Sequence, residues 1–207
     1  MVHERLGGDE YAALSLDSLN YGDLNRNRLA GNQSANADLL VSAANRLKAS
    51  QAEAIVICAN TPHMFVPDIE RRVELPVIHI AEANKNAVVE RGLHRVALIG
   101  TRFTTDLDFY DSRLRKAGIE CITPGDTDKD MLDRTIFGEL SRGEFTPAIR
   151  ELYLQMIDRL VEDGAEGIIL GCTEIPLLLE GCETPVPTFD TTRIHAAAAV
   201  DFMLGDG

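Results

Sequence analysis

Several features that would narrow the function are scarce or missing in this chain. It has no tryptophan, aromatic residues make up 5% of its 207 residues, and lysine plus arginine number 20 against 33 aspartate plus glutamate. The formal net charge is therefore −13, which argues against a nucleic-acid partner because phosphates need a basic face. A small anionic substrate stays open, since local arginines and helix N-termini create positive pockets in acidic proteins.

Long apolar runs and a secretion signal are also lacking. The apolar runs fall far short of a membrane span, and the opening MVHER has no apolar core region, so we expect a cytoplasmic protein with no membrane partner. Cysteines occur only at positions 58, 121, 172 and 182, which is not the pattern of a small secreted disulfide framework. No histidine lies at metal-ligand spacing from them, so we expect no metal site.

The chain contains one pattern twice, and each copy is built around a cysteine. Residues 51–62, QAEAIVICANTP, are echoed by residues 164–176, GAEGIILGCTEIP, with one inserted glycine. Each copy has an Ala-Glu start, a short apolar run, a cysteine and a proline four residues after it. The repeat favours two related domains within a length that permits either one or two.

Strand and helix patterns alternate along both halves, which predicts an α/β protein with mostly parallel sheets. The expected strands are 12–19, 54–58, 76–80, 95–100, 119–122, 167–171 and 186–189, and the expected helices are 34–49, 62–72, 107–117, 129–141 and 147–163. Ser34 or Asn36 is expected to open the first of these helices. The strand and helix at 95–117 have no counterpart upstream of residue 12. The first half is therefore expected to lack an opening strand, because the fold tolerates this or because the chain is shortened.

Both cysteines are predicted to end a strand and precede a helix, at the sheet edge where open α/β folds bind ligands. Pro62 and Pro176 suit the first turn of a helix, and Thr61 suits an N-cap. Each sulfur would then lie near a helix N-terminus that favours the thiolate, and lowering a thiol pKa from about 8.5 to about 7 takes roughly 2 kcal/mol.

Two such thiols suit a stereochemical inversion, in which one removes a proton from one face of a carbon and the other delivers a proton to the opposite face. Cys58 and Cys172 are the candidate catalytic residues, and no cofactor is needed. Backbone N–H groups after each cysteine, with Asn60, Thr61 and Thr173, are the candidate donors to the charge that develops on a substrate carboxylate.

These motifs resemble the paired cysteine signatures of the pyridoxal-independent aspartate/glutamate racemase family. The resemblance rests on CANTPH at 58–63 and GCTE at 171–174, and it extends over essentially the whole chain, including ERLGG at 4–8, GTRFT at 100–104 and FDTTRIHA at 189–196. Glutamate racemases of cell-wall synthesis tend to have Ser at the position of His63 and His at the position of Glu174. The sequence is therefore more similar to the aspartate branch.

The resemblance implies a homodimeric isomerase that interconverts L- and D-aspartate, with glutamate as a further candidate substrate. It implies two similar α/β domains related by a pseudo-twofold axis with the active site between them: residues 1–92 plus 187–207 with Cys58, and residues 93–186 with Cys172. Arg142 matches a basic residue that binds the distal carboxylate, and Arg5 resembles a second one. Family members usually begin with a strand and a Gly-Gly-Met-Ser loop that have no counterpart in this sequence.

Simpler interpretations remain for single residues and for the whole chain. His63 either tunes Cys58 or has a capping or packing role, Glu174 either assists Cys172 or begins a helix favourably, and Cys121 and Cys182 are expected to be inert. Other functions on this fold are maleate isomerase, hydantoin racemase and decarboxylase, although decarboxylases use one cysteine. A non-catalytic homologue that binds an acidic metabolite is the alternative from outside the enzymes.

Overall fold

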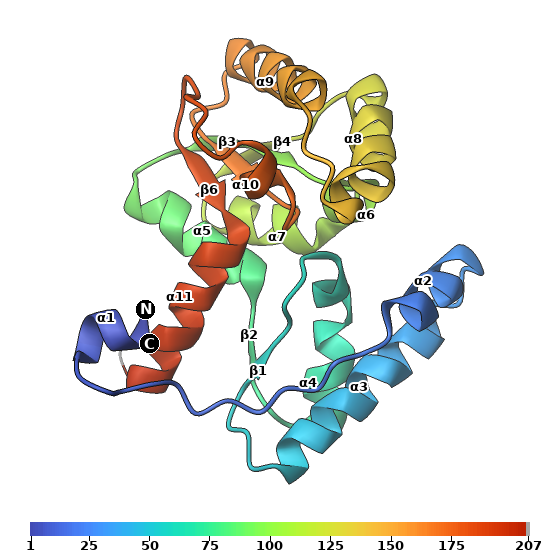
Figure 1. Cartoon of the computed structure of the whole chain (residues 1–207), viewed down its shortest axis with the longest axis vertical. Helices are drawn as coiled ribbons and strands as arrows, with labels where there is room; N and C mark the ends of the chain where they lie inside the picture. The colour runs from blue at the N-terminus through green and yellow to red at the C-terminus, as the bar shows by residue number, and fades with distance from the viewer. Residues whose placement is uncertain (206–207) are drawn as a thin grey trace. The chain divides into compact units, whose positions relative to one another are not determined.

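A computed structural model describes residues 1–205 of the chain, and these residues form two compact units (Figure 1). The first unit contains Met1–Ile57, Pro62–His79 and the residues from Ala197 onward, and the second contains Cys58–Thr61 and Ile80–Ala196. The sequence-based division at 92/93 and 186/187 places residues 58–61, 80–92 and 187–196 with the first domain, whereas the compact units group them with the second.

The second unit is built on a four-stranded parallel sheet in the order β4-β3-β5-β6. Its strands are β3 (Arg95–Ile99), β4 (Glu120–Ile122), β5 (Ile168–Leu170) and β6 (Thr188–Asp190). Its helices are α5 (Ile80–Glu90), α6 (Arg102–Thr105), α7 (Asp108–Lys116), α8 (Asp126–Gly138), the 3-10 helix η2 (Leu140–Arg142), α9 (Pro147–Glu162) and α10 (Ile175–Leu178), and α11 (Thr191–Leu204) begins in this unit.

Helices cover both faces of this sheet, as Figure 1 shows. Successive residues of a strand point to opposite faces, so each strand packs against both layers of helices. Val96 and Leu98 of β3 pack with residues of α5 and α7. Ala97 and Ile99 of the same strand pack with residues of α8 and α9. The near-continuous apolar run of the strand is thus explained by burial on both faces.

The first unit has a two-stranded parallel sheet of β1 (Ile55–Val56) and β2 (Val77–Ile78). Its helices are α1 (Val2–Leu6), α2 (Tyr21–Leu29), α3 (Gln33–Ala49) and α4 (Val66–Val73), together with the 3-10 helix η1 (Thr61–Phe65), whose first residue belongs to the second unit. Apolar residues of α3 and α4 form one buried cluster with Ile55 and Ile57. The predicted α/β class with parallel sheets is confirmed.

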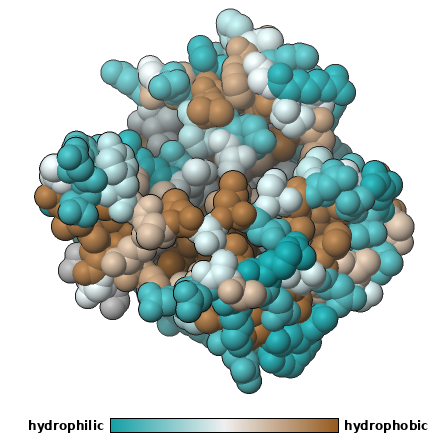
Figure 2. All heavy atoms as spheres, turned by 60° about the horizontal axis from the view of Figure 1, so that its bottom comes forward, coloured by the Kyte–Doolittle hydropathy of each residue, from teal (hydrophilic) through white to brown (hydrophobic). Residues whose placement is uncertain are grey.

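The predicted strand at 12–19 is wrong, because this segment has no regular secondary structure. Alternating residues favour an extended backbone, but a strand also needs a hydrogen-bonded neighbour, and none of residues 1–205 pairs with this segment as a strand. Tyr11, Leu14 and Leu16 are 78%, 80% and 88% exposed. Figure 2 shows hydrophobic residues among the hydrophilic ones on the face that it displays.

Helix α3 begins differently from the prediction, since Asn32 caps it rather than Ser34 or Asn36. The Asn32 side-chain oxygen accepts a hydrogen bond from the Ala35 N–H at 3.3 Å. Asn36 is buried instead, where it accepts from Asn27 and donates to the Leu24 carbonyl, each at 3.0 Å. These bonds join α3 to α2, a helix that the sequence patterns did not indicate. Within residues 1–205, no helix has the length and apolar character needed to cross a membrane.

Candidate active site

The second cysteine motif follows β5 through a backbone position that only glycine fits. A Cβ on Gly171 would lie 2.9 Å from the Ile99 carbonyl oxygen and 3.0 Å from side-chain atoms of Leu98 and Thr104. The Gly171 N–H donates to that same Ile99 oxygen at 2.7 Å. The glycine inserted in the second copy of the repeat therefore lets the chain pass close to β3 immediately before Cys172.

The Cys172 thiol is paired with a carboxylate. Its Sγ donates to Glu174 Oε2 at 2.9 Å, and the Thr173 hydroxyl donates to the same oxygen at 2.7 Å. Burial, the negative charge of Glu174 and the hydrogen bond to it raise the pKa of Cys172 far above its usual range, while the N–H groups of Glu174 and Thr173 act in the opposite direction. The predicted lowering of this thiol pKa is wrong, and Cys172 is a protonated donor at neutral pH.

The first cysteine motif is held by side chains of the second unit. Cys58 is exposed, and Asn60, two residues later, is buried. The Tyr110 hydroxyl donates to Asn60 Oδ1 at 2.6 Å, and Asn60 Nδ2 donates to the Thr191 hydroxyl at 3.0 Å. Both ends of the carboxamide thus have protein partners, and this arrangement supports the loop that carries Cys58.

Thr61 does not act as the predicted N-cap. It is the first residue of η1, and its hydroxyl lies 3.3 Å from the hydroxyl of Thr104, which is itself 3.4 Å from that of Thr101. Thr101 and Thr104 are buried and come from the GTRFT motif after β3. Residues from the first cysteine motif and from the end of β3 are therefore packed together.

His63 is a buried residue of η1. It is 1% exposed, and its ring is 4.7 Å from that of His79, with an interplanar angle of 55°. The packing role anticipated as one of its two interpretations accounts for this burial. A role of His63 in tuning Cys58 stays a prediction.

The two candidate carboxylate-binding arginines differ in their surroundings. Arg142 ends η2 and is exposed, and none of residues 1–205 forms an ion pair with its side chain. Gly143 follows it with a positive φ of 78°, a conformation that favours glycine at this helix end. Arg5 is paired with Asp201 of α11. Their roles toward a substrate stay predictions.

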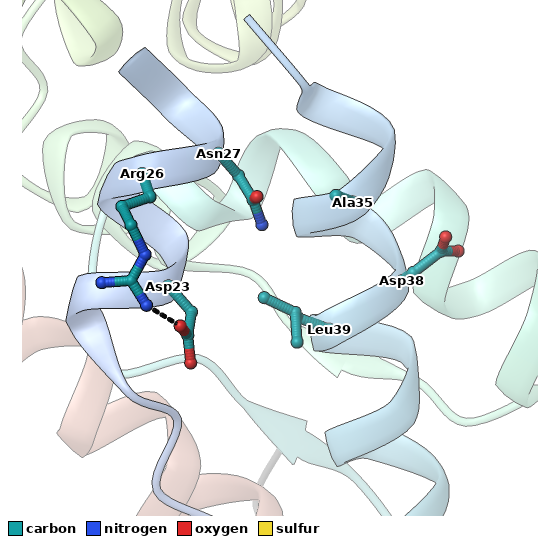
Figure 3. Close-up of a pocket in the computed structure, with 6 residues that line it drawn as sticks. All are labelled: Asp23, Arg26, Asn27, Ala35, Asp38 and Leu39. Carbon is teal, nitrogen blue, oxygen red and sulfur yellow. Dashed lines mark hydrogen bonds and ion pairs between the residues drawn. The ribbon is translucent and has the colours of Figure 1, made fainter. Parts of the chain in front are cut away.

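A hollow in the first unit provides no comparable chemistry (Figure 3). It has a volume of about 410 Å³ and lies along α2 and α3, where it is lined by Asp23, Arg26, Asn27, Ala35, Asp38 and Leu39. Its arginine is paired with Asp23, and Asp38 is paired with Arg72 at 2.7 Å. The charges around this hollow are thus largely neutralised by one another, and none of the candidate site residues lines it.

Sequence reasoning missed Tyr110 and Thr191, which hold the first cysteine motif. Tyr110 lies within the expected helix at 107–117, and Thr191 lies within the FDTTRIHA motif at 189–196. Their hydroxyl groups were the available signal, but their partner is Asn60, 50 and 131 residues away in sequence. Among residues 1–205, no group of three or more His, Cys, Asp or Glu is arranged to hold a metal ion.

Comparisons with known proteins agree with the paired cysteine motifs. The model of a family described as Asp/Glu/Hydantoin racemase matches residues 1–199. A crystal structure of a putative Asp/Glu racemase from Yersinia pestis is 42% identical, with a TM-score of 0.91, over 98% of this chain and 89% of that one.

An aspartate racemase homologue from Pyrococcus horikoshii OT3 is 32% identical, with a TM-score of 0.84, over 98% of this chain and 88% of that one. A glutamate racemase from Aquifex aeolicus is 27% identical over 79% of this chain. The match spans 64% of the length of that glutamate racemase.

Proposed function

Because the chain belongs to the Asp/Glu/Hydantoin racemase family, we propose that it interconverts the enantiomers of an acidic amino acid through Cys58 and Cys172. Racemisation of this kind needs an acid and a base on opposite faces of one carbon. The observation that carries the proposal is the Cys172 thiol, which is held as a proton donor against Glu174 at 2.9 Å. Both cysteines belong to the second unit.

In the proposed reaction, the Cys58 thiolate removes the α-proton of the substrate, so that a C–H bond breaks and an S–H bond forms. The electron pair of the broken bond is delocalised into the substrate carboxylate. Cys172 then gives its thiol proton to the opposite face of the same carbon and becomes a thiolate. The N–H groups of Thr173 and Glu174 hydrogen-bond to this sulfur and stabilise its charge. For the opposite enantiomer the steps run in reverse: the Cys172 thiolate is the base, the Cys58 thiol is the acid, and the starting protonation is restored.

Glu174 has a defined part in this scheme, which is to keep Cys172 protonated until the carbanion forms. Its carboxylate accepts the thiol proton in a hydrogen bond and disfavours a second negative charge beside it. The scheme uses no cofactor, because both proton transfers take place between substrate carbon and sulfur.

We propose aspartate as the preferred substrate, with glutamate as the further candidate. The Pyrococcus horikoshii relative, an aspartate racemase homologue, is 32% identical, compared with 27% for the Aquifex aeolicus glutamate racemase. Arg142 is our candidate for binding the distal carboxylate, since it is exposed and free of ion pairs with residues 1–205. Arg5 would first have to leave Asp201 to take part. Hydantoin racemisation is the second candidate function, because the family description includes it.

The test is solvent deuterium incorporation at Cα of L- and D-aspartate, L- and D-glutamate and a substituted hydantoin, without pyridoxal phosphate. We expect the wild-type chain to incorporate deuterium into both enantiomers of aspartate and to invert them. Cys58→Ala and Cys172→Ala should each abolish inversion. The absence of exchange and inversion for every substrate in correctly folded protein would contradict the proposal.

A further inference from the structure

We propose that Tyr110 and Thr191 are positioning residues that fix the Cys58 segment relative to the Cys172 segment. The catalytic consequence of this inference rests on the proposed racemase function. The positioning itself rests on hydrogen bonds within the second unit, and it is testable without turnover.

A continuous chain of side-chain hydrogen bonds joins the two cysteine motifs. Tyr110 donates to Asn60 at 2.6 Å, Asn60 donates to Thr191 at 3.0 Å, and Thr191 donates to the Leu170 carbonyl at 2.8 Å. Asn60 lies two residues after Cys58, and Leu170 lies two residues before Cys172. The Asn60 and Thr191 side chains therefore link the backbones of the two cysteine segments, and Tyr110 holds Asn60 from the other side.

Each of these side chains is withdrawn from solvent, which makes the bonds costly to lose. Tyr110 and Thr191 are both 0% exposed, and Asn60 is 5% exposed. A buried polar group that loses its partner is penalised more than the bond itself contributes, since water cannot replace the partner. Burial also raises the pKa of Tyr110 well above its usual value, so its hydroxyl remains a donor through the neutral range.

The order of donors and acceptors in these hydrogen bonds explains why Asn60 alone would not hold this loop. A carboxamide can rotate to exchange its oxygen and nitrogen, and only a donor on one side with an acceptor on the other selects a single orientation. Tyr110 supplies that donor. The Thr191 hydroxyl gives its proton to Leu170 and so presents an acceptor to Asn60. The contact between the Thr61 and Thr104 hydroxyl groups, at 3.3 Å, is longer than any of the three hydrogen bonds made by Tyr110, Asn60 and Thr191.

Loosening this anchor should affect inversion more than substrate binding. Inversion requires that both sulfurs reach one carbon, and a displacement of about 1 Å can reduce a reaction rate by roughly 100-fold. One-sided proton exchange requires only one sulfur at a time. The ratio of inversion to exchange is therefore a readout that a general loss of stability would not move.

The experiment compares Tyr110→Phe and Thr191→Val with two controls. Tyr153→Phe is the matched control, because Tyr153 is also 0% exposed in the second unit and its hydroxyl lies 2.9 Å from that of Thr135, outside the chain to Asn60. Thr191→Ser keeps the hydroxyl and is the conservative rescue. Amide hydrogen exchange is measured by mass spectrometry on peptides that cover residues 55–65, together with thermal unfolding and aspartate kinetics.

We expect faster amide exchange in residues 58–61 of Tyr110→Phe and Thr191→Val, by at least about fivefold, which is what loss of one net hydrogen bond implies. Tyr153→Phe and Thr191→Ser should exchange like the wild type in this segment. In Tyr110→Phe and Thr191→Val, kcat for inversion should fall at least about tenfold with a smaller change in KM. The ratio of substrate inversion to substrate proton exchange should also fall in these two variants.

Equal exchange of residues 58–61 in Tyr110→Phe, Tyr153→Phe and wild type would overturn the positioning role, whatever the activity. If the wild type does not racemise any substrate, the proposed function fails. The amide-exchange comparison still decides whether these hydrogen bonds anchor the Cys58 segment. Faster amide exchange with an unchanged ratio of substrate inversion to substrate proton exchange would overturn the catalytic consequence.

Discussion

Replacing Glu174 by glutamine tests the idea that a carboxylate keeps Cys172 protonated. The substitution keeps the size of the side chain and removes one negative charge that lies 2.9 Å from the sulfur. At this separation, two unit charges repel by about 1.4 kcal/mol even in the dielectric of bulk water, and by about 6 kcal/mol at an effective dielectric of about 20. The smaller figure alone corresponds to a roughly tenfold larger thiolate fraction.

We therefore expect the pKa of Cys172 to fall in Glu174→Gln, although burial, the largest cause of its raised pKa, remains. The assay is the pH dependence of iodoacetamide alkylation, followed at Cys172 by peptide mass spectrometry, since only the thiolate reacts. At a fixed alkaline pH, alkylation should be at least about tenfold faster in the variant. Glu180→Gln is the control, because it makes the same charge change at an exposed position beyond α10.

An alkylation profile of Cys172 that is the same in wild type, Glu174→Gln and Glu180→Gln would refute this reasoning. It would mean that burial alone sets the protonation of the thiol. The proposed role of Glu174 in keeping Cys172 a proton donor would then be removed from the mechanism.

Two further predictions concern stability. Gly171→Ala should lower the free energy of unfolding by roughly 1–3 kcal/mol in urea titrations, because the new Cβ would lie 2.9 Å from a backbone oxygen of β3. Gly138→Ala is the control and should be neutral or stabilising, because the space around its Cβ is open. Equal stability of the two variants would contradict the steric argument. Burial raises the pKa of Cys121 to about 12, so the folded protein holds this proton above about pH 8.5, where the unfolded thiol loses it. The resulting stabilisation is complete below about pH 8.5 and is lost as pH rises toward 12. Unfolding free energies between pH 7.5 and 10.5 should thus decline less steeply in Cys121→Ala than in wild type, and parallel declines would exclude this contribution.

The regular core of the second unit was predictable because its pattern is local. The apolar run of β5 and the amphipathic spacing of α9 appear in contiguous residues, and both elements form close to the expected positions. Segment 12–19 shows the limit of this reasoning, since its alternating pattern is present but no strand of residues 1–205 pairs with it. Local periodicity describes what a segment favours, and pairing depends on residues far away in sequence.

The chemistry of the site was predictable in part for a similar reason. The repeat identified two cysteines and the neighbouring Glu174, because the motif is contiguous. The protonation of Cys172 was not predictable from its place before a helix, because burial and the contact with the Glu174 side chain outweigh the nearby N–H groups. The hydrogen bonding of the Asn60 carboxamide was not predictable either, since its donor is Tyr110, 50 residues away in sequence.

The way in which the chain is shared between the two units has a consequence for its synthesis. The backbone passes from one unit to the other at 57/58, 61/62, 79/80 and 196/197. The first unit is therefore assembled from three separate stretches of sequence, and any contiguous fragment that contains it also contains all of the second. During translation, the first unit is completed only when the end of α11 emerges, so it is expected to wait for the last part of the chain while the second unit can already fold.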